Sequence, residues 1–562
     1  MREKLKKTII LLTPVFISLF IISGIYIGLQ INKNQNNRAN NNIKKLKESF
    51  LSTKNTVDAS TKIEQIINYI DRHYVDSVKK KKLRETAIKK LLHELDPHSV
   101  YISKDKIQKY REPIEGNFEG VGIQFMIRKD TVVVVSPIPG GPSEAVGIKA
   151  GDRIVKVEDE LIAGNGVTNK KVMNLLRGEK GSEVQVSIKR RGQEKLITKK
   201  ITRDKIPINS VEANLILENK IGYIRINRFA KNTYNEFKES VKKLKNSGMQ
   251  RLVLDLRGNG GGLLKAATKI LNDILTNGEL IVYTEGRAYD KKPYYADKGG
   301  MLKNKRIAVL IDRASASASE IVAGAIQDND RGIVVGRRSF GKGLVQEPVQ
   351  FNDGSAMRLT TARYHTPSGR CIQKPYKNTD YHDDIKKRVE KGELVNKDSI
   401  DFPDSLKYRT KNNRIVYGGG GIMPDIFVPI DTQDISRLYK ELVYTGILNN
   451  AAFEYADKHR KELNQYQGYR SFKKNFKVTE KILSNLIKKS KEKNIEIKDK
   501  SKLLENSDIK KRFKAIISRN IWDDKGYYSI MLEHDRVFNK AKKNLISKDY
   551  EKILNKNTKN SI

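Results

Sequence analysis

Three serines that alternate with alanine could supply a nucleophile: Ser315, Ser317 and Ser319. They lie between a buried-looking strand at 307–311 and an apolar, helix-like run at 321–326, and Lys342 follows between two glycines. A serine hydroxyl becomes an effective nucleophile when a neighbouring base takes its proton. The nearest histidine downstream, His365, sits on a separate predicted strand. Lysine is therefore the better candidate for the base.

A lysine base must be neutral to accept a proton. Burial favours the neutral amine, because it lowers the lysine pKa from its usual value of about 10.4. Three neighbours of Lys342 could form an apolar wall: Phe340, Leu344 and Val345. Gln346 lies four residues further on, and in an extended segment this spacing places both side chains on one face. We therefore expect Gln346 to hold the Lys342 amine by a hydrogen bond.

A glycine-rich loop at 255–262 could stabilise a negatively charged oxygen. It follows a buried strand at 252–256 and precedes a predicted helix at 263–275. Backbone N–H groups are exposed at the start of a helix, so the loop is a candidate oxyanion hole. A phosphate-binding loop is the alternative, but the Lys-Ser/Thr ending of a P-loop is missing and the dinucleotide fingerprint fits poorly.

These segments belong to an alternating pattern of strands and helices between residues 208 and 429. Strands are expected at 221–226, 252–256, 307–311 and 333–335, and helices at 234–246, 263–275 and 319–328. The alternation predicts an α/β core with largely parallel central strands. The polar segment 373–413 is interpreted as a surface insertion. His98 follows a helix-stopping Asp-Pro pair and is expected to be structural.

The segment 112–203 instead shows short strands and two short helices. Strands are predicted at 132–136, 153–157 and 182–189, and helices at 143–146 and 167–176. This small β-sandwich resembles a PDZ domain, whose carboxylate-binding loop maps to 118–123. Four residues are expected to bind a peptide C-terminus through backbone N–H groups and strand addition: Gly120, Val121, Gly122 and Ile123. An ordinary tight turn is the alternative.

The first residues resemble a membrane anchor. An uncharged stretch at 8–31 follows four basic residues, and its 24 residues are long enough to cross a hydrocarbon core of about 30 Å. A signal peptide is the competing interpretation, but the Ala-x-Ala-like cleavage site is missing. We expect an uncleaved single-pass anchor in the bacterial inner membrane, with the following domains on the periplasmic or extracytoplasmic side.

The net charge of +43 comes from 109 Lys and Arg against 66 Asp and Glu. Because the lysines are spread along the whole chain without a nucleic-acid motif, we expect a solvated lysine-rich surface and no nucleic-acid partner. Attraction to an anionic membrane surface is the alternative. The single cysteine, Cys371, excludes an internal disulfide, and no metal-binding motif or cofactor is predicted.

Several motifs in one order resemble the C-terminal processing (tail-specific) serine peptidases, over about residues 60–430. They are Ser315–Ile321, Phe340–Gly343 with Gln346, the glycine loop at 255–262, and Thr366–Arg370. The family joins a PDZ domain to a Ser-Lys catalytic core. Its spacing of 25 residues between nucleophile and base selects Ser317, and the resemblance makes Lys342 the general base and Gln346 its orienting partner.

The resemblance also assigns roles that the residues alone do not reveal. It places the oxyanion hole at the N–H groups of Gly261 and Ala318, and it implies that Arg177 couples the position of the PDZ domain to the active site. The chain has Gly260 where the family often has proline.

The sequence therefore predicts a multidomain α/β protein. Its parts are a cytoplasmic flank and anchor (1–31), a linker and helical region (32–111), a PDZ domain (112–203), an α/β peptidase core (204–431) and a C-terminal helical region (432–562). We expect a serine endopeptidase that recognises substrate proteins with apolar C-termini and cleaves near the tail through an acyl-enzyme. A catalytically silent PDZ scaffold is the alternative, and a trypsin-like protease is disfavoured because its nucleophile motif is missing. The helices at 43–110 and beyond 432 are candidates for self-association into a homo-oligomer.

Overall fold

The computed structural model describes residues 60–297, 300–376, 381, 383–431, 437–493, 495, 503 and 505–555. The predicted anchor at 8–31 lies outside these residues. Within the described residues, no helix is both long enough and apolar enough to span a membrane. The chain divides into two units, 1–91 and 92–562. The first contains α2 (Ser60–His73) and most of α3 (Lys80–Leu95), which correspond to predicted helices.

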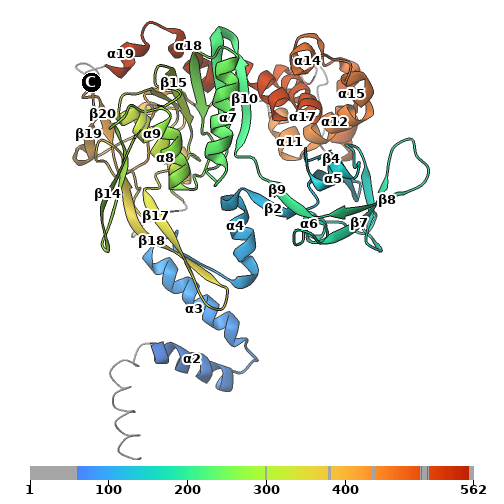
Figure 1. Ribbon diagram of the computed structural model, residues 1–562, viewed down its shortest axis with the longest axis horizontal. Coiled ribbons are helices and arrows are strands. Elements are labelled where there is room, and N and C mark those ends of the chain that lie inside the picture. The colour runs from blue at the N-terminus through green and yellow to red at the C-terminus, as the bar shows by residue number, and fades with distance from the viewer. Residues whose placement is uncertain are drawn as a thin grey trace, which may run out of the picture. The chain divides into compact units, whose positions relative to one another are not determined.

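A six-stranded sheet forms the centre of the second unit (Figure 1). Its strands, in spatial order, are β10 (Val211–Leu217), β11 (Ile221–Ile226), β12 (Arg251–Asp255), β15 (Arg306–Ile311), β16 (Ile333–Gly336) and β21 (Ile426–Phe427). The strands from β11 to β21 are parallel, and β10 pairs antiparallel with β11. The predicted α/β core with parallel central strands is confirmed.

Both faces of this sheet are covered, which explains the continuous apolar runs of its strands. Alternate residues of β12 and β15 enter two different cores, as the two-residue period of a strand requires. One face packs against α7 (Thr233–Asn246), α8 (Leu264–Asn272) and α9 (Ala318–Asp328). The other packs against α18 (Arg536–Ile546) and α19 (Tyr550–Leu554), from the end of the chain. The predicted boundary at 432 therefore does not separate two independent cores.

A second sheet carries the lysine segment. Its strands are β1 (Val100–Ile102), β18 (Ala356–His365), β13 (Leu280–Gly286) and β14 (Tyr289–Tyr295), and β17 (Leu344–Gln350) pairs with β18. Strand β17 begins two residues after Lys342. Its pairing with β18 therefore fixes the position of the lysine segment at the start of the strand. Strand β1 was not predicted, since its three residues fell within a segment interpreted as helical.

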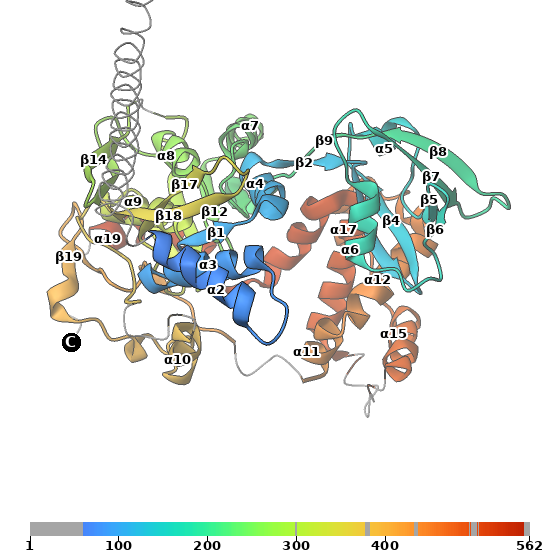
Figure 2. The same cartoon turned by 90° about the horizontal axis from the view of Figure 1, so that it is seen from below.

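The PDZ segment has a core of its own. Its strands are β3 (Ile123–Arg128), β4 (Thr131–Pro137), β5 (Arg153–Val157), β6 (Glu160–Leu161), β7 (Glu183–Lys189) and β8 (Ile197–Thr202), with α5 (Pro142–Ala145) and α6 (Asn169–Leu176). The strands form one hydrogen-bonded sheet instead of two separate layers, because β5 pairs with both β4 and β7. A ribbon of β2 (Asn117–Gly120) and β9 (Asp204–Pro207) joins this segment to the rest of the unit (Figure 2).

The C-terminal helices form a further apolar cluster. They are α11 (Arg437–Tyr444), α12 (Ile447–Lys458), α13 (Arg460–Leu463), α14 (Tyr469–Asn475), α15 (Glu480–Glu492) and α17 (Ser507–Met531). Leu442 and Ile447 are buried in this cluster, and Tyr439 and Val443 pack against it. Leu442, Tyr439 and Val443 thus belong to the face of α11 that packs in the cluster, whereas Ile447 is the first residue of α12.

Candidate active site

The start of α9 distinguishes the three serines. Ser315 and Ser319 are fully buried, and their hydroxyls donate to the carbonyls of Leu256 (2.8 Å) and Asn259 (2.9 Å). Ser317 is partly exposed and adopts φ 54° and ψ −114°, a backbone conformation that is strained for a residue with a side chain. The structure therefore leaves Ser317 as the serine of this segment whose hydroxyl can meet a substrate.

The glycine loop lies directly beside Ser317. A Cβ added to Gly261 would approach Ser317 Cβ to 2.7 Å and the Ala318 nitrogen to 3.0 Å, so only glycine fits. Ala318 is the first residue of α9, and its N–H has no acceptor within the helix. The Gly261 N–H instead donates to Asn259 Oδ1 at 2.8 Å. The structure thus brings both predicted oxyanion residues to the serine, but one of the two donors is engaged by a side chain.

The lysine is held as the sequence predicts. Lys342 Nζ donates to Gln346 Oε1 at 2.9 Å, and Gln346 Nε2 donates to the carbonyl of His98 at 2.8 Å. Burial, together with the positive charge of Arg358, lowers the pKa of Lys342 to about 8. A substantial fraction of the amine is therefore neutral near pH 8, as a lysine base requires.

A buried carboxylate links the serine to the lysine. Glu320 accepts hydrogen bonds from the backbone N–H groups of Ser317 (2.8 Å), Lys342 (2.8 Å) and Gly341 (2.7 Å), and from the Ser339 hydroxyl (2.5 Å). Burial raises the pKa of Glu320, although these four donors oppose the shift. We did not predict this role. Its one signal was a Glu three residues after a Ser at a helix start, the pattern of a capping box.

A tyrosine makes the same link through carbonyl groups. The hydroxyl of Tyr364, on β18, lies 3.1 Å from the carbonyl oxygen of Ser317 and 2.5 Å from that of Lys342. Tyr364 is almost fully buried. Because the two backbone segments share both Glu320 and Tyr364, they are fixed relative to each other.

The segment 373–413 does more than cover the surface, which corrects the interpretation as a surface insertion. Arg388, on α10 (Asp384–Glu390), is buried and donates to the carbonyls of Ser339 (2.7 Å) and Phe340 (3.2 Å). The Gln373 side chain accepts from the Gly343 N–H at 2.8 Å. This polar segment therefore supports the loop that carries Lys342, which its composition did not indicate.

The turn at 96–99 contacts Gln346 through the carbonyl of His98. Asp96 accepts hydrogen bonds from Ser99 and from the backbone N–H of His98, and the His98 ring lies 2.7 Å from the Tyr381 hydroxyl. Burial and the nearby charge of Lys342 lower the pKa of His98 to about 4. His98 is therefore neutral at ordinary pH, and it contributes a carbonyl to the site instead of a titrating ring.

The turn at 366–370 supports the other end of α9. Arg370 is fully buried and donates to Asp328 Oδ1 at 2.6 Å and to Gln327 Oε1 at 2.8 Å, both in the last turn of the helix. This motif thus fixes the helix whose first turn carries Ser317.

The predicted peptide loop lies at one edge of the PDZ sheet. Gly120 ends β2, Val121 is buried, Gly122 has φ +73°, and Ile123 begins β3. Strand β3 is the first strand of the sheet and pairs with β4 on one side. Arg177 contacts Glu112 at 2.7 Å and the Phe118 ring at 4.7 Å, at the root of the domain. The structure does not bring Arg177 together with Ser317 or Lys342.

A strained serine at a helix start, linked to a half-buried lysine beside a glycine loop, is an arrangement for acyl transfer. Among the described residues, no group of three or more His, Cys, Asp or Glu side chains could hold a metal ion. The fold and the site thus define a serine peptidase with a PDZ domain.

Comparisons with known proteins give the family. The model for peptidase family S41 matches residues 220–383, the PDZ domain model matches 120–201, and that of the activating protease CtpB N-terminal domain matches 19–106. A family of unknown function matches 438–523. The chain belongs to peptidase family S41 and, within it, to the carboxy-terminal processing serine proteases.

Individual relatives cover a little more than half of the chain. The carboxy-terminal-processing protease of Bartonella bacilliformis is 38% identical over 57% of this chain and 74% of its own length. CtpB of Bacillus subtilis is 36% identical over 56% of this chain and 66% of its own length. The solved structure of a photosystem II D1 C-terminal processing protease is 33% identical over 57% of this chain and 91% of that chain, with a TM-score of 0.31.

Proposed function

We propose that this protease cleaves proteins near an apolar C-terminal tail by Ser-Lys catalysis, with Ser317 as nucleophile, Lys342 as general base and Gln346 as its orienting partner. One observation carries the proposal: Lys342, whose half-buried amine has its pKa lowered to about 8, is tied to the backbone of Ser317 because Glu320 accepts hydrogen bonds from the backbone N–H groups of both residues. A base with a pKa near the working pH transfers protons efficiently in both directions.

The reaction then proceeds in two halves. The neutral Lys342 amine takes the proton of Ser317 Oγ as the oxygen attacks the carbonyl carbon of the scissile peptide. When the tetrahedral intermediate collapses, the C–N bond breaks and the Lys342 ammonium gives its proton to the leaving amine. Water, deprotonated by the same amine, attacks the acyl-enzyme and releases the new C-terminus, and the proton returns to Ser317.

The developing oxyanion is held by backbone donors. The Ala318 N–H, at the first position of α9, is the first donor. The Gly261 N–H is the second, and it serves when it exchanges Asn259 Oδ1 for the substrate oxygen. Such donors lower the barrier because they are already in place when the charge forms.

The PDZ domain selects the substrate. Gly120, Val121, Gly122 and Ile123 bind the terminal carboxylate, and the edge of β3 accepts the peptide as an added strand. Three apolar side chains that are only partly buried and pack against the PDZ core are Ile123, Phe125 and Leu175. These side chains favour an apolar residue at the end of the tail. The uncharged segment at 8–31 would anchor the enzyme in a membrane, with the catalytic domain outside the cytoplasm.

The test separates binding from cleavage. The wild-type protein should shorten a test protein with an apolar tail, and mass spectrometry should locate the cut near its C-terminus. Ser317→Ala and Lys342→Ala should abolish cleavage but bind the tail peptide with the wild-type affinity. The same peptide with an amidated C-terminus should bind weakly to all three proteins.

Two results would contradict the proposal. Full turnover by Ser317→Ala would exclude this nucleophile. Tail binding without any cleavage by the wild type, and without labelling of Ser317 by a serine-reactive phosphonate, would favour the silent scaffold.

A further inference from the structure

We propose that two residues of the C-terminal region, Asp535 at the start of α18 and Tyr528 on α17, position the oxyanion loop through Arg257 and Arg225. The proposal rests on the proposed function, since it gives these residues a role in that reaction. It assigns a task to a part of the chain that lies outside the resemblance to the peptidases.

The network begins at the foot of the glycine loop. Asp255, the last residue of β12, is fully buried, and the side chain of Arg257 donates to it from Nε (2.9 Å) and Nη2 (2.6 Å). The carboxylate also accepts from the Tyr223 hydroxyl at 2.7 Å and lies 3.0 Å from Arg225 Nη1. Burial alone would raise the pKa of Asp255, but Arg257 and Arg225 lower it to about 2. The carboxylate is therefore ionised, and it depends on both arginines.

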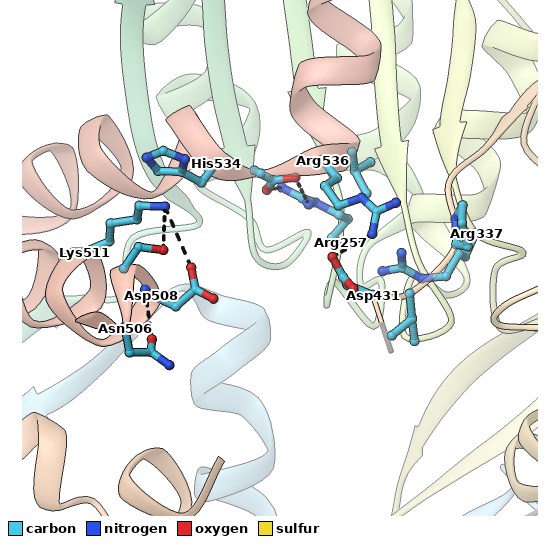
Figure 3. A pocket seen from close by; sticks show the side chains of 13 residues that line it. Arg257, Arg337, Asp431, Asn506, Asp508, Lys511, His534 and Arg536 are labelled. Atoms are coloured by element: carbon cyan, nitrogen blue, oxygen red, sulfur yellow. Dashed lines mark hydrogen bonds and ion pairs between the residues drawn. The ribbon is translucent and has the colours of Figure 1, made fainter. Parts of the chain in front are cut away.

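The first arginine reaches the C-terminal region. Arg257 Nη1 and Nη2 lie 3.0 and 2.7 Å from the two carboxylate oxygens of Asp535, the residue that caps α18. Figure 3 shows Arg257 in the polar pocket that these C-terminal helices share with the peptidase core. Arg257 thus holds two carboxylates at once, one in the core sheet and one in the C-terminal region. Paired contacts of this kind fix the orientation of the guanidinium plane.

The second arginine gives an independent link. Arg225 Nη2 donates to the backbone carbonyl of Arg257 at 3.0 Å, and Arg225 Nε donates to Glu212 at 2.8 Å. The hydroxyl of Tyr528, on α17, donates to the same Glu212 oxygen at 3.0 Å, and its ring lies 5.4 Å from the Arg225 guanidinium. Both the side chain and the backbone of Arg257 are therefore held, directly or through Glu212, by residues of the last two long helices.

The position of Arg257 matters because the oxyanion loop follows it immediately. Gly258 N–H donates to Asp312 at 3.0 Å, and the Asn259 carbonyl accepts from Ala316 N–H at 3.0 Å. Gly261 then approaches Ser317 as closely as the backbone allows. A shift of Arg257 would move this loop against the nucleophile, and a misplacement of about 1 Å can cost about 10²-fold in rate.

Helix α18 is a firm support for this contact. Val537, Phe538, Ala541 and Leu545 pack in the core cluster on the second face of the sheet. Asp535 therefore has a fixed position relative to β12, and it can hold Arg257 in a defined orientation.

The variant Asp535→Asn tests the proposal. Asparagine caps a helix as well as aspartate does, so α18 keeps its hydrogen bond to the Phe538 N–H while Arg257 loses a charged partner. We expect kcat to fall about tenfold, less than the roughly 10²–10³-fold loss when an oxyanion donor is removed outright. KM and tail-peptide affinity should stay unchanged. The affinity for a peptide boronic acid, which mimics the tetrahedral intermediate, should fall in parallel with kcat.

A matched control lies in the same pocket. Asp431→Asn removes the charge of an ion pair with Arg536 of α18 (2.7 Å) but leaves Asp535 and Arg257 in place, and it should leave kcat unchanged. Tyr528→Phe, which removes only the hydroxyl that bonds Glu212, should lower kcat in the same sense as Asp535→Asn.

The outcomes distinguish the two proposals. If the wild type cleaves but both variants keep the wild-type kcat and boronate affinity, the positioning role is wrong. It is equally wrong if kcat falls only in proportion to the folded fraction measured by circular dichroism. If the wild type does not cleave and Ser317 is not labelled by a phosphonate, the proposed function itself fails.

Discussion

At the residue scale, the proposal that Lys342 is the general base predicts how the rate of cleavage depends on pH. For a pKa of about 8, the neutral fraction of the amine rises about tenfold between pH 7 and pH 9. We therefore expect the cleavage rate to rise about tenfold over this range and then level off. His98, with its pKa of about 4, does not titrate in this window. Initial rates on a tailed test protein, with folding monitored at each pH, would check this, and a flat profile from pH 7 to 9 would contradict it.

The same pKa predicts a cost in stability. In the unfolded chain Lys342 has a pKa near 10.5, so between pH 8 and 10.5 the unfolded state binds more protons and the free energy of unfolding rises with pH. Below pH 8 the full penalty applies, up to about 3 kcal/mol. In a Ser317→Ala background, Lys342→Met should therefore raise the melting temperature at pH 7, and the gain should shrink towards pH 10.5.

The expected gain in melting temperature is limited by Gln346. In Lys342→Met its Oε1 loses the donor that it has in the wild type, which offsets part of the gain. Lys386→Met, at an exposed lysine of α10, should change the melting temperature little at any pH. A lower melting temperature for Lys342→Met at pH 7 would show that the charged amine of Lys342 does not destabilise the folded protein.

Glu320 does not react with the substrate in the proposed reaction, but we expect its replacement to lower both stability and cleavage. Glu320→Gln replaces one acceptor oxygen by an NH₂ group that faces N–H groups of the backbone. Leaving two buried donors without an acceptor costs about 2–6 kcal/mol, at about 1–3 kcal/mol each. We expect a lower melting temperature and a loss of cleavage that exceeds the loss of folded protein. Wild-type turnover by the folded variant would contradict the link between Ser317 and Lys342.

At the scale of elements, the strand and helix pattern of the peptidase core was predictable for a physical reason. A parallel sheet covered on both faces produces continuous apolar runs, and β12 and β15 show them without ambiguity. The spacing of Lys342 and Gln346 likewise predicted their contact. Local rules carried these predictions, because the information lies within a few residues.

The unpredicted parts depend on contacts between distant segments. An amphipathic pattern shows that α18 buries one face, but it does not show that the face packs on the core sheet. Tyr364 lies on an ordinary strand, and only the fold brings its hydroxyl to Ser317 and Lys342. The polar composition around Arg388 predicted a solvent-exposed segment. This arginine is instead buried, and it donates hydrogen bonds to two backbone carbonyls.

Helix α10 therefore gives a test of an element that looked peripheral. Arg388→Met leaves the carbonyls of Ser339 and Phe340 without a donor and removes the ion pair with Asp384 at 2.9 Å. Asp384 keeps its ion pair with Lys374, and each buried acceptor left without a donor costs about 1–3 kcal/mol. We expect a lower melting temperature and a reduced kcat, measured with saturating substrate. Lys386→Met on the same helix is the control, and equal effects of the two substitutions would contradict the supporting role of Arg388.

At the scale of the whole molecule, the active site is assembled from segments along most of the chain. The turn at 96–99 holds Gln346, the core sheet carries the glycine loop, and the segment 373–413 supports the lysine loop. Asp535, which caps the C-terminal helix α18, holds Arg257 at the start of the glycine loop. An α/β core that ended at residue 431 would therefore lack both a covered sheet face and part of the support of its glycine loop.

This dependence predicts the effect of shortening the chain. A protein that ends at residue 531 loses six large apolar side chains from the core: Leu532, Val537, Phe538, Leu545, Tyr550 and Leu554. At about 1.5–3 kcal/mol each, their burial contributes about 9–18 kcal/mol, as much as the whole stability of an ordinary domain, about 5–15 kcal/mol. We expect the shortened protein to be insoluble or to unfold without a cooperative transition, as seen by circular dichroism. If the chain ending at 531 melted cooperatively at the wild-type temperature, α18 and α19 would not be part of the core, and the role of Asp535 at Arg257 would be excluded as well.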